Sequence, residues 1–222
     1  MKIERIADHV DWLVINKPAG ISMQIEQNDP QTLSLQQQVQ LQFQLEQIFP
    51  VHRLDKATSG LVIFAKSSAA AAEFTRLFSE KQVEKRYIAL ANGKPKKKQG
   101  WIKGDMAKGR NGSWLLQRSM NNPAQTYFQS VAIDVKKYHA NRLYLLTPKT
   151  GKTHQLRVAM KSNGVAILGD ERYKGDNAER CYLHALWLCF NWLGEQVELH
   201  AFPTQGNWPE LHQLDLTNEL TA

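Results

Sequence analysis

Short apolar runs divided by turn-forming residues recur through the first half of the chain. The runs at 12–15, 61–65 and 83–91 are rich in β-branched and aromatic residues. Runs of this length and composition predict buried strands. The first run stops at residues 16–20, Asn-Lys-Pro-Ala-Gly, which place proline and glycine where a turn needs them. We therefore expect a strand followed by a turn at this point.

Two segments between these runs favour helices. Behind Ser67 and Ser68, a candidate N-cap, apolar residues at positions i, i+4, i+7 and i+8 predict an amphipathic helix through Lys81 that covers one face of the sheet. Residues 32–49 fit both a strand and a helix, because their apolar residues alternate in one part and also recur at helical spacing. Glutamine, a good helix former, dominates residues 36–47, so we predict a helix there.

The second half of the chain predicts an antiparallel meander. Segments near 114–118, 125–133 and 142–147 carry alternating or apolar runs divided by turn residues. After the last of these, Gly151 is placed to open a helix toward Ser162. The first amide groups of such a helix would form an anion site.

Length and charge bound the class of protein. A chain of 222 residues suffices for one sizeable core and shows no internal repeat or interdomain linker, so we predict one compact domain over residues 1–222. Lys and Arg number 28 against 21 Asp and Glu, which gives a net charge of +7. This excess favours a polyanionic partner, although solubility alone would also explain it. The basic runs 94–98 and 108–110 fit solvated surface and phosphate contacts about equally.

The N-terminus and the cysteines point to a reducing compartment inside the cell. Charges stand among the first five residues, where a secretory peptide needs apolar ones, and no segment reaches the ~18 apolar residues of a membrane span. Cys181 and Cys189 lie in one apolar stretch, which indicates reduced core residues rather than a disulfide framework or a metal site. We expect a soluble, cytoplasmic protein with no membrane partner.

Residues 51–61, at the entrance of the second predicted strand, are Val-His-Arg-Leu-Asp-Lys-Ala-Thr-Ser-Gly-Leu. In isolation, Arg-x-Asp-Lys would indicate a loop in which Asp55 pairs with Arg53 or Lys56. This string, however, resembles the signature of the RluA-type RNA pseudouridine synthases, His-Arg-Leu-Asp followed by x-x-Thr-Ser-Gly-Leu, at every specified position. The resemblance makes Asp55 a candidate catalytic residue.

Other strings extend this resemblance over roughly residues 11–203. The matching strings are residues 16–20, 85–90, 169–173, 183–185 and 201–203. Residues 150–158 resemble the family's Thr-Gly-Arg-x-His-Gln-Leu-Arg, but Lys152 replaces the usual arginine and Ala159 the histidine that follows. The resemblance implies an α+β fold with a mixed, largely antiparallel central sheet flanked by helices. It also implies that no accessory RNA-binding domain precedes the catalytic one.

Conversion of uridine to pseudouridine breaks the bond from base to sugar and joins C5 of the base to the sugar instead. A positioned carboxylate can be the covalent partner, and Asp55 is the candidate, attacking either base or sugar. Arg157, whose counterpart pairs with the aspartate in relatives, would hold Asp55 anionic and oriented, but a structural ion pair predicts the same contact. A strand tyrosine is more often core, yet the resemblance gives Tyr87 an aromatic face for the extruded uracil and a hydroxyl near the C5 proton.

The resemblance places the remaining candidate residues at the substrate. Arg53, beside the nucleophile, would fill the gap that the flipped base leaves. The predicted substrate site is completed by His52, Lys152, Thr153 and His154, with His52 interpreted as a hydrogen-bonded structural residue. We predict RNA, either rRNA or tRNA, as the partner of a monomer with no obligate protein partner. We also predict no metal and no cofactor, because neither a plausible ligand cluster nor a dinucleotide fingerprint is evident.

Two other classes of function stay open. The altered residues Lys152 and Ala159 would suit an RNA-binding module or a folding chaperone that has lost activity. A carboxylate-dependent glycosidase would usually need a second carboxylate, and none is apparent around Asp55.

Overall fold

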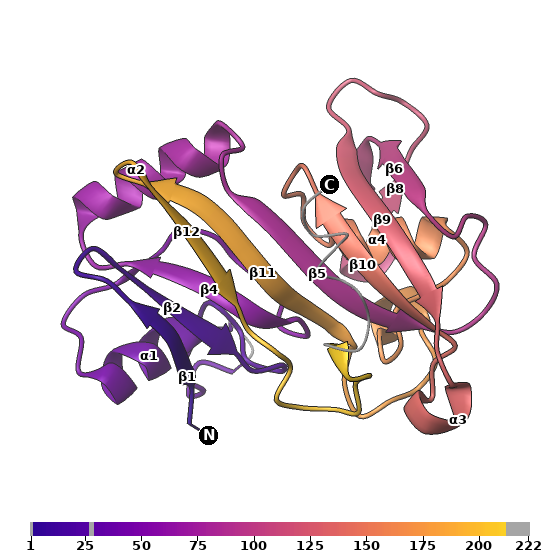
Figure 1. Ribbon diagram of the computed structural model, residues 1–222, viewed down its shortest axis with the longest axis horizontal. Helices are drawn as coiled ribbons and strands as arrows, with labels where there is room; N and C mark the ends of the chain where they lie inside the picture. The colour runs from indigo at the N-terminus through magenta and orange to yellow at the C-terminus, as the bar shows by residue number, and fades with distance from the viewer. Residues whose placement is uncertain (1, 27–28, 212–222) are drawn as a thin grey trace.

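One ten-stranded sheet runs through the molecule and contains every predicted strand except one (Figure 1). The computed structural model describes residues 2–26 and 29–211. The ends of the predicted domain, 1–222, therefore lie outside the described residues. That the whole chain forms a single domain stays a prediction.

The elements follow one another with short connections in most places. The strands are β1 (Glu4–Asp8), β2 (Trp12–Lys17), β3 (Phe49–Pro50), β4 (Ser59–Ala65), β5 (Glu84–Ala91), β6 (Gly100–Gly104), β7 (Met106–Lys108), β8 (Trp114–Leu116), β9 (Ala124–Ala132), β10 (Arg142–Pro148), β11 (Leu183–Trp192) and β12 (Glu195–His200). The helices are α1 (Leu35–Phe43), α2 (Ser68–Ser79), α3 (Val135–Tyr138) and α4 (Gln155–Ser162), with short 3₁₀ helices η1 (Arg110–Gly112) and η2 (Glu171–Tyr173).

The strand order confirms the predicted fold class. The sheet runs β1-β2-β4-β11-β5-β10-β9-β6, with β12 added to β11 and β3 added to β4. Strands β4 and β11 pair in parallel, and the other described pairs are antiparallel. The fold is therefore α+β, with a mixed and largely antiparallel sheet.

The predicted meander is right for β9 and β10 but wrong for residues 114–118. Strand β8 pairs only with β7, in a separate two-stranded hairpin. The neck of this hairpin is closed by Asp105, whose N–H donates to the carbonyl of Ser119 at 2.9 Å and whose carbonyl accepts from Gln117 at 2.8 Å. These bonds direct the chain out of the main sheet.

Most other elements form where the hydrophobic pattern places them. Strands β2, β4 and β5 cover the predicted runs. Helix α2 is capped by Ser67, whose hydroxyl accepts from the N–H of Ala70 at 3.1 Å, and ends two residues before Lys81. The ambiguous glutamine-rich stretch forms α1, and Ser34 caps it in a capping box with Gln37.

The helix predicted to open at Gly151 begins four residues later. The side chain of Gln155 folds back over the preceding turn, and its Oε1 accepts from the Thr150 hydroxyl at 2.7 Å and from the Lys152 N–H at 3.0 Å. His154 then adopts a left-handed backbone, with φ of 56°, before α4 starts. The predicted start at Gly151 is therefore wrong, and the anion site at its first amides stays a prediction.

Helices α1 and α2 cover opposite faces of β2 and β4. On β4, Val62 and Phe64 belong to the core cluster that includes α1, whereas Leu61 and Ile63 belong to the cluster that includes α2. Neighbouring side chains of a strand point to opposite faces, so a strand covered on both sides needs a continuous apolar run. This explains the composition of residues 61–65.

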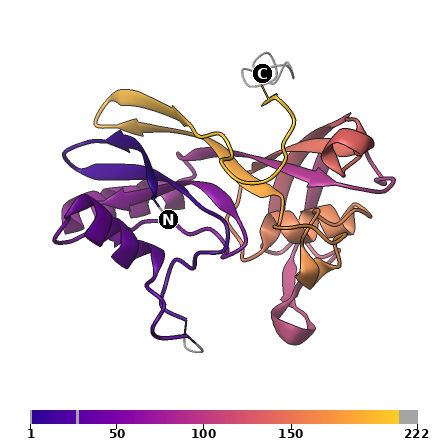
Figure 2. The ribbon, with the colours of Figure 1, turned by 90° about the horizontal axis from the view of Figure 1, so that it is seen from below.

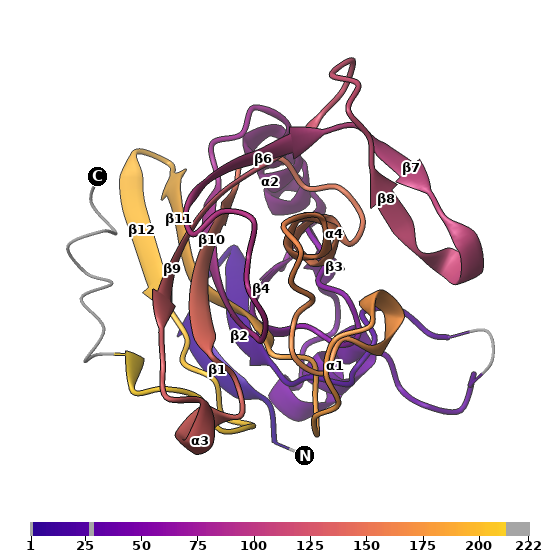
Figure 3. The ribbon, with the colours of Figure 1, turned by 90° about the vertical axis from the view of Figure 1, so that its right-hand side faces the viewer.

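The helices divide the molecule into two halves on either side of β11 and β5. Figure 2 shows α1 and α2, in purple, at one end of the sheet and α4, in orange, at the other. Figure 3 shows α4 within the curve formed by β10, β9 and β6. Residues of the two halves can therefore face each other across the middle of the sheet.

Candidate active site

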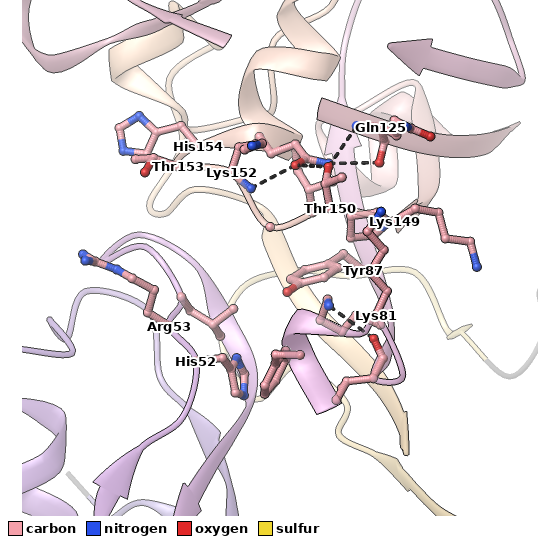
Figure 4. A pocket seen from close by; sticks show the side chains of 18 of the residues that line it. His52, Arg53, Lys81, Tyr87, Gln125, Lys149, Thr150, Lys152, Thr153 and His154 are labelled. Atoms are coloured by element: carbon pink, nitrogen blue, oxygen red, sulfur yellow. Dashed lines mark hydrogen bonds between the residues drawn. The ribbon is translucent and has the colours of Figure 1, made fainter. Parts of the chain in front are cut away.

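A cavity of about 780 Å³ opens between the two halves (Figure 4). Its walls come from the loop before β4, the start of β5 and the segment that joins β10 to α4. The structure brings all the sequence-predicted site residues to this one cavity: His52, Arg53, Asp55, Tyr87, Lys152, Thr153, His154 and Arg157.

Asp55 lies in the loop that enters β4, and a buried lysine holds that loop. The ammonium of Lys17 donates to the carbonyls of Pro18 at 2.9 Å, Lys56 at 3.2 Å and Thr58 at 2.7 Å. Burial lowers the pKa of Lys17 to about 7, with the charge of Arg180 as a smaller cause. Its matching motif, residues 16–20, indicated only a turn, so the sequence did not reveal that Lys17 supports the loop.

A second hydrogen-bond network, around Ser59 and His184, holds the start of β4. The Ser59 hydroxyl contacts Nδ1 of His184 at 2.7 Å and accepts from Arg180 at 2.6 Å. The other ring nitrogen of His184 lies 2.7 Å from the carbonyl oxygen of Ala201. Strand β11 and the segment after β12 therefore support the loop that carries Asp55.

Arg157 joins Asp55 to a second carboxylate. Its Nη1 donates to Oδ2 of Asp55 at 3.1 Å, while its Nε and Nη2 donate to the two oxygens of Asp170 at 2.8 and 2.7 Å. Burial acts to lower the pKa of Arg157, but the bonds to Asp170 and the charges of both carboxylates outweigh it and raise that pKa. The guanidinium is therefore permanently charged and fixed in direction.

The two carboxylates differ in their access to the cavity. The side chain of Asp170 is 0% exposed, whereas that of Asp55 is 23% exposed and lines the cavity. A purely structural ion pair would have no need of such an opening. Asp170 is the partner of Arg157 that sequence reasoning missed, because the match at residues 169–173 carried no indication of this contact.

Tyr87 lies on β5 with its side chain in the cavity. It stands opposite Leu146 of β10 and Ala185 of β11, so strands on both sides hold it. Burial raises the pKa of its hydroxyl, and the negative charge of Asp55 raises it further. The phenol is therefore protonated at neutral pH. Figure 4 shows the ring crossing the pocket with its hydroxyl directed toward the Arg53 side.

The two residues before Leu54 have different surroundings. Nε2 of His52 accepts from the N–H of Ile63 at 2.9 Å, and its ring lies 5.1 Å from that of Phe78. Burial lowers the pKa of His52 to about 3. This neutral, hydrogen-bonded ring fits the structural role expected for it. Arg53 is exposed, and Figure 4 shows it across the pocket from Thr153 and His154.

The turn before α4 brings His154 toward the candidate nucleophile. Its Nδ1 lies 2.9 Å from the hydroxyl oxygen of Tyr173, and its Nε2 lies 3.9 Å from Oδ2 of Asp55. The ammonium of Lys152 donates to Oδ1 of Asn122 at 2.9 Å. The sequence placed both residues at the substrate but did not predict the contact of His154 with Asp55.

The described residues offer neither a metal cluster nor a membrane-spanning helix. Residues 2–26 and 29–211 contain no group of three or more His, Cys, Asp or Glu side chains placed to hold a metal ion. Within the same residues, none of the helices has the length and apolar character that a membrane crossing needs. Cys181 is buried, Cys189 is partly buried, and both are free thiols.

Comparison with known proteins gives one consistent result. The family model of RNA pseudouridylate synthase matches residues 11–162. A protein of Haemophilus influenzae named uncharacterized RNA pseudouridine synthase is 48% identical over 211 residues, which are 94% of this chain and 91% of that protein. The dual-specificity RNA pseudouridine synthase RluA of Pasteurella multocida is 35% identical over 193 residues, covering 82% of this chain and 83% of the relative.

A solved structure agrees in fold over the whole described chain. Human RNA pseudouridylate synthase domain containing 1 superimposes with a TM-score of 0.78 at 25% sequence identity. The superposition covers 99% of this chain and 96% of the human one. The ten-stranded sheet and the cavity at its centre therefore sit in a fold of known type.

Proposed function

The chain belongs to the RNA pseudouridylate synthase family, and from that premise we propose that Asp55 is the covalent nucleophile with which it isomerises uridines in rRNA or tRNA. The expected resemblance to the RluA-type synthases is confirmed, and the enzyme is an RNA pseudouridine synthase, an isomerase. The roles of the site residues, the flipping of the base and the identity of the RNA are what we propose here.

One observation carries the role of Asp55. It presents a partly exposed carboxylate to the cavity while Arg157, locked by the buried Asp170, holds one of its oxygens. A nucleophile needs this combination of an ionised, oriented and accessible group. Glu84 also borders the cavity, but it is three residues before Tyr87 on β5 and so belongs to the opposite face of the strand.

The reaction leaves the composition of the RNA unchanged. The bond from C1′ of the ribose to N1 of uracil breaks, the base turns, C5 bonds to C1′, and the proton lost from C5 is balanced by one gained at N1. The carboxylate of Asp55 forms a temporary bond either to C1′ or to C6 of the base and leaves when the new bond is complete.

Tyr87 supports this chemistry in two ways. Its ring would offer a flat face to the extruded uracil, and its hydroxyl would take part in removal of the C5 proton. Because the phenol is protonated, it can accept that proton only by passing its own on in the same step.

RNA has to release the target base before Asp55 can reach it. Arg53 is exposed and two residues from Asp55, which suits a side chain that enters the stack in place of the flipped base. We also propose that the enzyme works as a monomer in the cytoplasm, without a protein partner or cofactor. The two free cysteines fit a reducing compartment.

Incubation of the purified protein with uridine-labelled tRNA and rRNA from cells that lack its gene tests this function. Digestion to nucleosides should reveal pseudouridine, and comparison with RNA from wild-type cells should identify the uridine. Free uracil would indicate a glycosidase instead, and unaltered RNA that is retained by the protein would indicate a binding module.

A further inference from the structure

His154 has a backbone conformation and a position beside Asp55 that a general contact with substrate does not explain. It is a non-glycine residue with φ of 56°, in the left-handed region that side chains other than those of Asn, Asp and His rarely adopt. Its side chain is 15% exposed and lines the cavity beside Asp55. Backbone strain that persists at a cavity wall is a reason to look for a function.

Two hydrogen bonds favour one tautomer of the His154 ring. The N–H of Trp114 on β8 donates to the hydroxyl oxygen of Tyr173 at 3.0 Å, and that hydroxyl lies 2.9 Å from Nδ1 of His154. Among the described residues, no acceptor other than Nδ1 contacts the hydroxyl of the buried Tyr173, which favours donation of its proton to Nδ1. The neutral ring then carries its own proton on Nε2.

That proton faces Asp55. Nε2 lies 3.9 Å from Oδ2, the same oxygen that accepts from Arg157 at 3.1 Å. Within the described residues, the other carboxylate oxygen, Oδ1, has no protein partner. Two donors from α4 and its preceding turn thus converge on one oxygen and leave the other free toward the cavity.

Tyr173 supports both donors. Its ring meets that of His154 edge to face, with centroids 5.8 Å apart, and the Arg157 guanidinium lies 5.1 Å from its centroid. Removal of its hydroxyl alone would leave these ring contacts in place. The hydroxyl can therefore be tested separately from the packing.

We propose that His154, held by Tyr173 as the Nε2–H tautomer, is a second positioning residue for Asp55, and that Oδ1 of Asp55 is the oxygen that attacks. This inference rests on the proposed function of Asp55. The distance of 3.9 Å is too long for a hydrogen bond in the free enzyme, and such contacts often shorten when substrate binds. His154 then restricts rotation of the carboxylate as the bond to the substrate forms.

The ionisation of His154 agrees with this arrangement. The charged groups around it are Asp55 from the loop before β4, Arg157 from α4, and Asp170 and Arg172 from the segment containing η2. Burial lowers the pKa of His154, Arg157 and Arg172 lower it further, and the two aspartates oppose them. The ring is therefore neutral at neutral pH, where its tautomer decides what it donates.

Two substitutions at this position separate donation from backbone fit. Asn tolerates the left-handed backbone and can still accept from Tyr173, but it is too short to reach Asp55. Gln fits the backbone less well, yet its amide N–H can approach the place of Nε2–H. We expect His154→Asn to lower the single-turnover rate on labelled tRNA and rRNA by between about tenfold and a hundredfold, and His154→Gln to lose clearly less.

RNA retention on filters should be unchanged in both variants, because positioning affects the rate and not the affinity. His200→Gln is the matched control, since His200 lies 3.7 Å from Glu198 but is exposed on β12. An Asn variant as active as Gln, or a loss of rate matched by an equal loss of retention, would overturn the proposal. A wild-type protein that forms no pseudouridine would instead refute the proposed function.

Nitrogen NMR of histidine-labelled protein gives a readout that does not need activity. The ring of His154 should show a protonated Nε2 and an unprotonated Nδ1 at neutral pH. Tyr173→Phe should abolish this preference and lower the single-turnover rate while RNA retention stays at the wild-type level. A wild-type ring protonated on Nδ1, or a tautomer that does not respond to Tyr173→Phe, would contradict the proposal.

Discussion

Asp55 and Tyr87 meet in the cavity but depend on different kinds of support. Asp55 is held by ionic and polar contacts from Arg157 and from the Lys17-supported loop, whereas Tyr87 is held by its place between two neighbouring strands. Loss of a polar group should therefore affect the chemistry at either residue without unfolding the sheet.

Tyr87→Phe should keep the stacking face and remove only the hydroxyl. We expect RNA retention to be unchanged and product formation to fall by about a hundredfold, within the range typical of general acid–base groups. Single-turnover formation of pseudouridine, measured beside filter retention, checks this. A fully active Phe variant would show that the hydroxyl has no necessary part in proton transfer.

Two histidines, the buried His184 and the partly buried His52, should make stability depend on pH. Burial lowers the folded-state pKa of His184 to about 4 and that of His52 to about 3. Between these pH values and pH 6.5, the ordinary pKa of histidine, the unfolded chain therefore binds more protons than the folded protein. Stability from His184 is present above pH 6.5 and is lost as pH falls toward 4, by up to about 3 kcal/mol. Urea unfolding at several pH values measures this.

The matched variants separate His184 from other titrating groups. His184→Gln should reduce the slope of the unfolding free energy between pH 6.5 and 4, whereas the exposed control His200→Gln should leave it as in the wild type. An unchanged slope in His184→Gln would show that His184 is charged in the folded protein.

Strand β4 is the element that places the loop carrying Asp55, and its contact with β11 is close. Gly60 has φ of +113°, and a Cβ there would lie 2.3 Å from the carbonyl oxygen of Ala185. The two residues are partners in the parallel pair β4–β11. Glycine is required here because any side chain would push the strands apart just after Asp55.

Gly60→Ala should therefore destabilise the protein and reduce activity. Gly194→Ala is the control, because Gly194 has a similar φ of +96° but open space around its Cβ position. Both variants carry backbone strain, and Gly60→Ala should lose about 1–3 kcal/mol more in urea unfolding through the clash. Equal losses would mean that β11 moves aside without cost.

Local patterns predicted the elements that local forces decide. The apolar run of β4, the capped helix α2 and the loop around Asp55 were all recognisable, because periodicity and capping act over a few residues. The start of α4 was not, since the long side chain of Gln155 ties back the preceding turn through bonds that periodicity does not report. The same holds for the hairpin β7–β8.

The sequence predicted which residues line the candidate site but not the residues that hold them in place. Residue identities and the resemblance placed Asp55 and Arg157 together, and both line the cavity. The supports Asp170 and Lys17 act across distances in the sequence that single motifs do not connect. Lys17 reaches the loop before β4 from the neighbouring strand β2, and Asp170 reaches Arg157 from the segment containing η2, so both roles depend on the tertiary fold.

The whole molecule carries a net charge of +7. One basic cluster, Lys96–Lys98, is attached to α4, the helix that carries Arg157. The ammonium of Lys96 donates to the carbonyl of Ser162 at 2.8 Å, and the N–H of Lys97 to Oδ1 of Asn163 at 3.0 Å, both at the end of α4. Lys97 and Lys98 are exposed beside this anchor. They are the members of the cluster best placed for phosphate contacts.

Replacement of Lys97 and Lys98 by Gln should flatten the salt dependence of RNA binding. Each lost phosphate contact lowers the slope of log affinity against log salt by about 0.7–0.9. Filter binding over a range of salt concentrations measures this slope. The control replaces the two lysines of α3, Lys136 and Lys137, by Gln. Equal slopes for both double variants and the wild type would show that the cluster is solvated surface.

The proposed mechanism depends on Asp55 as the covalent nucleophile, and Asp55→Asn tests this role most directly. A neutral amide of the same shape cannot form the bond, so turnover should be abolished. RNA retention should persist, since phosphate contacts elsewhere supply most of the affinity. Asp134→Asn is the matched control: Asp134 is an exposed cap of α3, and Asn caps a helix equally well.

The decisive measurement is pseudouridine formation by purified Asp55→Asn protein, with RNA retention followed in the same samples. We predict no pseudouridine above the level without enzyme, wild-type retention, and full activity of Asp134→Asn. Residual pseudouridine formed by folded Asp55→Asn protein would contradict the assignment of Asp55 as the nucleophile.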